Sequence, residues 1–353
     1  MRRIAILAEG HFHWQGAKTA VGMIRYGQDQ VVAVLDSTKA GQDTAQVLGN
    51  GVGAGIPIVR DVGEALKYRP DTLLIGIAPI GGRLPDPWRG QVLQALNAGL
   101  HIISGLHEFL DDDPELHEAA ERHHAHIWDV RRPPADRAML IARYTPHRPG
   151  SHTVYVAGSD CNVGKMTTAL ELDREAQRRG LSSGFAATGQ TGIMISGRGV
   201  PVDRLISDFT AGGVEALTLE FTQEYEWVFV EGQGSLIHPA YSPVTLGLLH
   251  GAMPDMMILC YEPGRTHIKS YSVPIPPLPR VIEIYEQAIG WLRAAPVVGI
   301  ALNTYELDEA SALDEMRRAE AETGLPATDC VRFGAGKLID ALLERAKNQA
   351  KTS

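Results

Sequence analysis

The chain has 353 residues, of which 44% are hydrophobic and 21% charged, and its formal net charge at pH 7 is -9. This length is enough for two domains of ordinary size, each with its own core. The negative charge argues against a general nucleic-acid binder, which needs a basic face, and no apolar run reaches the roughly 18 to 20 residues of a membrane span.

The cysteines predict the cellular compartment. There are three, Cys161, Cys260 and Cys330, and they are far apart in the sequence. Neither a disulfide framework nor a closely spaced metal site is indicated, so we expect a reducing cytoplasm. The apolar stretch that begins at Ile4 is too short for the core of a signal peptide and is better interpreted as a first strand.

The first 130 residues alternate between short apolar runs and helix-like segments, which is typical of a parallel sheet with crossover helices. We therefore predict an α/β fold that starts with a Rossmann-like domain. The loop at 10–16 lacks the dinucleotide-binding glycine spacing, so a structural role is favoured there. The predicted elements are Ile4–Ala8, Lys18–Tyr26, Val31–Asp36, Thr72–Ile77, Trp88–Ala98, His101–Ser104 and Glu115–Ala125.

Proline and glycine interrupt the periodicity between Arg131 and Gly150. Such a stretch is typical of a domain boundary. We predict an N-terminal domain at 1–150 and a C-terminal domain at 151–353.

The second domain opens with an apolar run at 153–157, followed by a glycine-rich loop and a helix-permissive segment. Glycines allow backbone N–H groups to turn inward, and the start of a helix and a lysine both attract anions. The pattern therefore predicts a phosphate-binding loop. Its residues are Gly158, Ser159, Asp160, Cys161, Asn162, Val163, Gly164, Lys165, Met166, Thr167 and Thr168.

Two features of this loop are unusual. Five residues separate Gly158 from Gly164 instead of four, and Met166 stands where a magnesium-binding Ser or Thr normally follows the lysine. The longer spacing resembles the loop of dethiobiotin synthetase and its relatives. This resemblance implies a three-layer αβα domain. Thr167 or Thr168 is a candidate to replace the missing hydroxyl.

Further polar residues follow the next predicted strands of this domain. Gln190 and Thr191 lie in a glycine-rich loop after a short strand, and Asp203 lies just beyond; all three are candidates for substrate or metal contact. Glu231 ends the strand that starts at Trp227, where an acid reaches the magnesium beside such a loop. If a magnesium nucleotide is used, Thr167 and Glu231 are the predicted metal ligands.

Later residues suggest catalytic and substrate-binding roles. His238 suits a general base, and Arg265 suits a clamp for a carboxylate. Asn303 ends the strand at Val297–Leu302, a position from which an amide reads an adenine edge. The proline-rich stretch at Ser272–Pro279 predicts an extended arm, and Leu338–Lys347 predicts a terminal helix.

The strings Gly158–Leu172, Val230–Ser235 and Glu262–His267, with Ala17–Ala20 in the first domain, resemble the DUF1611 family. The resemblance covers essentially the whole chain. Members similar to this chain are D-glutamate N-acetyltransferases, which pass the acetyl group of acetyl-CoA to the amine of D-glutamate. The resemblance therefore implies an acetyltransferase that uses acetyl-CoA as its cofactor.

This resemblance can be combined with the residue pattern. Coenzyme A carries phosphates that the loop would hold, and His238, Asp203 or Glu231 would act as the base. Arg265 and Lys269 would bind the substrate carboxylates. Two alternatives stay open, an ATP- and magnesium-dependent ligase or kinase and a non-catalytic nucleotide-binding module. A homodimer is the expected oligomer.

Overall fold

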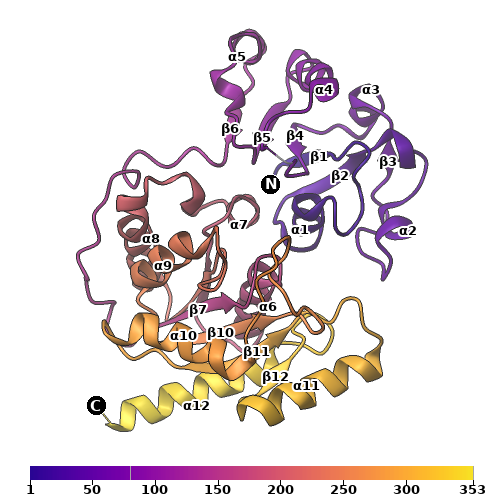
Figure 1. The fold of residues 1–353 in the computed structure, drawn as a ribbon. Coiled ribbons are helices and arrows are strands. Elements are labelled where there is room, and N and C mark those ends of the chain that lie inside the picture. Colours follow the sequence, from indigo (N-terminus) through magenta and orange to yellow (C-terminus); the bar gives the residue numbers. More distant parts are fainter. Residues whose placement is uncertain (80, 353) are drawn as a thin grey trace. The chain divides into compact units, whose positions relative to one another are not determined.

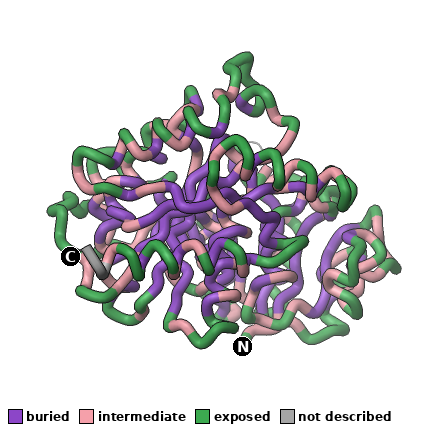
Figure 2. Tube along the Cα trace, turned by 90° about the horizontal axis from the view of Figure 1, so that it is seen from below, coloured by how far each residue is buried: buried purple, intermediate pink, exposed green. Residues whose placement is uncertain are grey.

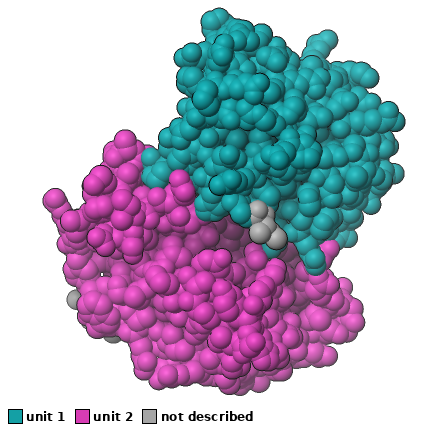
Figure 3. Space-filling view, turned by 45° about the horizontal axis from the view of Figure 1, so that its top comes forward, with its two compact units in different colours: residues 1–133, 190–197 teal, residues 134–189, 198–353 magenta. Residues whose placement is uncertain are grey.

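The computed structural model describes residues 1–79 and 81–352. The chain forms two compact units (Figure 3): unit 1 is Met1–Pro133 with Gln190–Gly197, and unit 2 is Pro134–Gly189 with Arg198–Ser353. The structure thus divides the chain after Pro133, before the predicted boundary at 150. The reason is that the following segment is bonded to unit 2, where Glu215 accepts hydrogen bonds from the backbone N–H groups of Arg143 (2.7 Å) and Thr145 (2.6 Å).

Unit 1 contains a six-stranded sheet in the order β3-β2-β1-β4-β5-β6, and every pairing is parallel. This doubly wound order confirms the predicted Rossmann-like domain. Its strands are β1 (Arg3–Leu7), β2 (Gln30–Leu35), β3 (Ile58–Val59), β4 (Thr72–Ile75), β5 (His101–Ser104) and β6 (Ile127–Asp129); its helices include α1 (Lys18–Tyr26), α2 (Thr44–Leu48), α3 (Val62–Ala65), α4 (Asp86–Asn97) and α5 (Pro114–Arg122).

Asp36, at the end of β2, has a structural role in unit 1. Its buried carboxylate accepts hydrogen bonds from the backbone N–H groups of Phe12 (3.1 Å) and Thr38 (3.0 Å) and pairs with Lys39. It therefore joins the loop after β1 to the turn after β2, as expected for a structural layer.

Unit 2 contains a second six-stranded parallel sheet, in the order β12-β11-β10-β7-β9-β8. Figure 1 shows its helices around the strands. The strands are β7 (His152–Gly158), β8 (Ser183–Ala186), β9 (Trp227–Glu231), β10 (Met256–Tyr261), β11 (Val297–Leu302) and β12 (Ala327–Thr328); the helices include α6 (Lys165–Arg178), α8 (Thr210–Glu224), α9 (Ser242–Ala252), α10 (Leu278–Gly290), α11 (Glu309–Thr323) and α12 (Gly336–Thr352).

The position of β7 determines where a ligand site can form in unit 2. The chain first adds β8 and β9 on one side of β7 and then β10 to β12 on the other. The strand order therefore reverses at β7, and ligands of open α/β sheets bind at the carboxyl ends of strands at this point. The loop after β7 lies at that place.

The strands are buried because both faces of each sheet are covered. Figure 2 shows the strands as the buried interior and many outward helix faces as exposed. In unit 2 the core includes Tyr155, Phe221, Val230 and Leu259, each at most 2% exposed. Such a core holds the carboxyl edge of the sheet in place for the loops above it.

Two predicted loops are partly helical. Leu278 and Pro279 belong to the first turn of α10, where the missing N–H of proline costs no hydrogen bond. Gln190 and Thr191 begin α7 (Gln190–Ser196) in unit 1, and the Thr191 hydroxyl is 2.9 Å from that of Thr19. Among the described residues, no helix combines the length and apolar composition needed to cross a membrane.

Candidate anion-binding site

The loop between β7 and α6 exposes a row of backbone donors. Asn162 and Gly164 have positive φ angles of 59° and 101°, which turn the chain sharply before the helix begins. Within the described part of the chain, the four consecutive N–H groups from Gly164 to Thr167 make no hydrogen bond. Orphan N–H groups at a helix N-terminus attract anions, so we call the loop 158–168 the anion cradle.

Lys165 adds a positive charge to the anion cradle. Its side chain is only 7% exposed, and Nζ donates a 2.7 Å hydrogen bond to the carbonyl oxygen of Asp160. Burial lowers the pKa of this ammonium. Two glycines make room for it, because an added Cβ would lie 2.9 Å from Lys165 Cδ at Gly158 and 3.2 Å from the same atom at Gly232.

Asp160 and Arg265 fix the conformation of the loop. The buried carboxylate of Asp160 accepts from the N–H of Cys161 (2.6 Å), from Arg265 Nη1 (3.0 Å) and from the N–H of Lys269 (2.8 Å). Arg265 also donates to the carbonyl of Cys161 (2.7 Å) and to Glu262 (2.6 Å). The predicted substrate clamp is thus already occupied by two carboxylates of the protein itself, and it acts here as a clamp on the loop.

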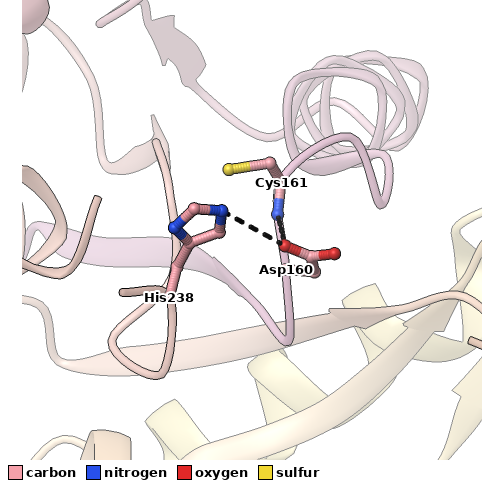
Figure 4. Close-up of side chains that lie close together, drawn as sticks. All are labelled: Asp160, Cys161 and His238. Atoms are coloured by element: carbon pink, nitrogen blue, oxygen red, sulfur yellow. Dashed lines mark hydrogen bonds and ion pairs between the residues drawn. The ribbon is translucent and has the colours of Figure 1, made fainter. Parts of the chain in front are cut away.

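His238 approaches the anion cradle from the segment after β9 and is 2% exposed. Its Nδ1 accepts a 3.1 Å hydrogen bond from the N–H of Ala240, and its Nε2 is 4.0 Å from Asp160 Oδ1. Figure 4 shows the imidazole and the Cys161 thiol turned toward each other above Asp160. Burial lowers the pKa of His238, which favours the neutral imidazole.

The groups of Asp160, Cys161 and His238 lie within 4.8 Å of one another and include donors that zinc accepts. The surroundings favour an anion instead. The Asp160 carboxylate is already bonded, and the cations of Lys165 and Arg265 repel a metal ion. Burial raises the pKa of the Cys161 thiol, which favours its neutral form.

Glu231 links two strand ends beside the cradle. It is 4% exposed, and its Oε2 accepts hydrogen bonds from the N–H groups of Thr188 and Gly189, both 3.0 Å long. Burial raises its pKa to about 7. Glu231 is near enough to Lys165 for their charges to interact. Thr167, the other predicted magnesium ligand, is the third residue of α6.

The other predicted residues are spread over the chain. An added Cβ at Gly164 would lie 3.9 Å from Asn303 Cβ, so Asn303 is a neighbour of the cradle. Lys269 is exposed, and Asp203 is exposed on a single turn at Val202–Arg204. Gln190 and Thr191 belong to unit 1, whereas the cradle belongs to unit 2.

Several contributors were not predicted. Tyr285 donates a 2.9 Å hydrogen bond to the carbonyl of Gly158 and accepts from the N–H of Leu236 (3.2 Å). The rings of Tyr241 and Tyr271 pack against the imidazole of His238 at 4.5 and 5.1 Å. Their positions follow from tertiary packing, and no local sequence pattern marks them.

Two family models match the chain. Residues 142–339 match a model described as the DUF1611_C P-loop domain, a domain of unknown function. Residues 37–133 match a model described as the DUF1611_N Rossmann-like domain, also of unknown function. The first model covers all six strands of the unit 2 sheet, and the second covers β3 to β6 of the unit 1 sheet.

Individual proteins are similar over most of the chain. A protein of Tritonibacter scottomollicae named D-glutamate N-acetyltransferase is 40% identical over 331 residues, which are 92% of this chain and 94% of that protein. A protein of a Pseudoalteromonas species, also named D-glutamate N-acetyltransferase, is 34% identical over 278 residues. These are 78% of this chain and 82% of that protein. The crystal structure of a DUF1611 family protein from Anabaena variabilis matches with a TM-score of 0.90 and 41% identity, covering 98% of this chain and 100% of that one.

Proposed function

Because this chain belongs to the DUF1611 family, we propose that it transfers the acetyl group of acetyl-CoA to the amino group of D-glutamate or a similar acidic amino acid. The observation that carries the proposal is the 40% identity, over 92% of the chain, to a protein named D-glutamate N-acetyltransferase. The chemistry of the anion cradle is compatible with that reaction.

The cradle suits the diphosphate of coenzyme A. Four N–H groups without protein acceptors, the start of the 14-residue helix α6 and the ammonium of Lys165 converge there. Donors of this kind bind phosphate oxygens without hydrolysing them. Asn303 is close to Gly164, and we assign the contact with the attached nucleoside to it.

An acidic amino acid needs positive partners for its carboxylates. Arg265 is committed to Asp160 and Glu262, so it is a poor candidate. Lys269 is exposed, and its side chain forms no hydrogen bond or ion pair within the described residues. We therefore assign the carboxylate contact to Lys269.

The proton of the substrate ammonium must be removed before the amine attacks the thioester. The diphosphate and the thioester lie at opposite ends of the pantetheine arm. The arm is flexible, so a diphosphate in the cradle does not by itself fix where the acetyl group lies. Of the three candidate bases, His238 and Glu231 are buried and Asp203 is exposed, so we assign the proton transfer to the carboxylate of Asp203.

The same cradle favours a second candidate, an ATP-dependent ligase or kinase. A nucleotide diphosphate has the same donors to bind. Met166 weighs against this candidate, because it occupies the position of the usual magnesium-binding hydroxyl.

One assay separates the candidates. Release of free CoA thiol is measured with acetyl-CoA and D-glutamate, and release of ADP and phosphate is measured with ATP and D-glutamate. We expect thiol release only, and we expect Lys165→Ala to abolish most of it while Lys347→Ala, a change of an exposed lysine on α12, leaves it unchanged. ATP consumption that depends on D-glutamate would refute the acetyltransferase proposal, and so would the absence of thiol release with either glutamate enantiomer.

A further inference from the structure

The imidazole of His238 is held in one orientation. Its Nδ1 accepts the N–H of Ala240 at 3.1 Å, and the rings of Tyr241 and Tyr271 pack against it. A backbone N–H always donates, so Nδ1 has to carry a lone pair. In a neutral imidazole the single proton is then on Nε2.

That Nε2–H group is directed at the cradle and has no acceptor. Its nearest carboxylate oxygen, Asp160 Oδ1, is 4.0 Å away, beyond the length of a hydrogen bond, and it already accepts from the N–H of Cys161. Only 2% of the surface of His238 is exposed. Within the described residues, Nε2 is not one of the fully enclosed polar atoms that lack a partner, so a ligand oxygen can reach this donor and supply its acceptor.

We propose that His238 is a neutral hydrogen-bond donor, not the general base, and that its Nε2–H binds an oxygen of the diphosphate held in the anion cradle. The donor complements the free N–H groups of Gly164 to Thr167. The proposal rests on the acetyltransferase function only for the identity of the cofactor. Any ligand with a diphosphate meets the same donors.

With this role for His238, the Cys161 thiol has no base in the imidazole beside it. A thiol that attacks a thioester needs a neighbouring base to take its proton. Figure 4 shows the thiol on the Nε2 side of the imidazole, and this nitrogen already carries the proton. A second proton, on Nδ1, would point at the N–H of Ala240. The charged groups that act on the pKa of His238 are Asp160, which raises it, and Lys165, which lowers it together with burial.

The test uses His238→Gln, which keeps a neutral N–H donor but has no basic nitrogen, and His238→Ala, which has neither. The control is His250→Gln on α9, whose Nε2 lies 2.9 Å from the carbonyl of Ala288, away from the cradle. Affinities for CoA and for inorganic pyrophosphate are measured by calorimetry. Values of kcat and KM are measured between pH 6 and 9, and thermal unfolding verifies that each variant is folded.

We expect His238→Ala to weaken binding of both ligands at least about tenfold, which corresponds to about 1.4 kcal/mol. His238→Gln is expected to stay within about threefold of wild type and to keep the same pH profile of kcat, since a charged-acceptor hydrogen bond is retained. The ¹⁵N signals of His238, identified by their loss in His238→Gln, are expected to show a proton on Nε2.

Three results would overturn the proposal: a proton on Nδ1, equal loss of kcat in both His238 variants with unchanged CoA affinity, or a stable acetyl group on Cys161 after incubation with acetyl-CoA alone. The last result would place the thioester, not the diphosphate, at the loop. The wild type releasing no CoA thiol would refute the acetyltransferase function. The role of His238 would still stand if His238→Ala weakened pyrophosphate binding and His238→Gln did not.

Discussion

Arg265 and Asp160 come from loops that follow adjacent strands, β10 and β7, and they meet at the point where the strand order of the unit 2 sheet reverses. Nη1 of the arginine donates a 3.0 Å hydrogen bond to the aspartate, whose side chain is completely buried. The same guanidinium binds the carbonyl of Cys161. One side chain thus determines the shape of the anion cradle from the neighbouring loop.

Arg265→Ala is therefore expected to damage the loop as a whole. Removing one partner of a buried ion pair leaves an uncompensated carboxylate and costs about 3 kcal/mol. We expect a loss of this size in urea unfolding, together with weaker CoA binding. The double variant Arg265→Ala with Asp160→Asn is expected to recover part of the stability. If Arg265→Ala instead raises only the KM for D-glutamate, the arginine binds substrate and does not clamp the loop.

Glu231 predicts a dependence of stability on pH. Its pKa is about 7 in the folded protein and 4.5 ordinarily, so the folded state keeps a proton that the unfolded state releases. The wild type therefore loses stability as the pH rises from about 4.5 to 7, by up to about 3 kcal/mol. Below pH 4.5 both states are protonated and the penalty is absent.

Glu231→Gln removes this titration. The variant is expected to gain stability relative to wild type between pH 4 and pH 8, as measured by urea unfolding at both pH values. Glu344→Gln, an exposed change on α12, serves as the control and is expected to show no such difference. A stability difference between Glu231→Gln and wild type that is the same at both pH values would show that Glu231 is ionised in the folded protein.

Asp203→Asn tests the assignment of the base. A positioned base contributes at least about a hundredfold to the rate, so kcat is expected to fall by that factor. Affinity for CoA is expected to stay unchanged, since Asp203 lies outside the cradle. The neighbouring exposed Asp208 provides the control substitution, Asp208→Asn. An unchanged kcat in Asp203→Asn would remove this residue from the mechanism.

Two buried tyrosines give a matched pair of stability predictions. The hydroxyl of Tyr155 has no hydrogen-bond partner, whereas that of Tyr285 binds Gly158 and Leu236. Tyr155→Phe is expected to be as stable as wild type or more stable by about 1 kcal/mol, while Tyr285→Phe loses about 1 to 2 kcal/mol. Thermal unfolding of both variants measures the difference. Equal losses would mean that Tyr155 is hydrogen-bonded, for example to a buried water.

Features formed by residues that are contiguous in the sequence could be predicted from it. The strand, turn and helix around Gly158 and Lys165 are contiguous, so a local pattern predicts them, and the order of apolar runs predicts two parallel sheets. It did not reveal the partners of Arg265, because Asp160 is 105 residues earlier in the chain and becomes a neighbour only when β7 and β10 pair. For α7 the glycines suggested a loop, but packing in unit 1 determines the helix.

The path of the main chain through α7 restricts how the protein can be dissected. The chain leaves unit 2 after Gly189, contributes eight residues to unit 1 and returns at Arg198. In unit 1 the hydroxyls of Thr191 and Thr19 are paired, and the side chains of Met194 and Gln190 pack closely over Gly105. A truncated fragment starting at Pro134 would keep α7 but lose these packing partners, which would leave its apolar side chains in water. Expressing either unit by itself therefore requires redesign of the segment 190–197.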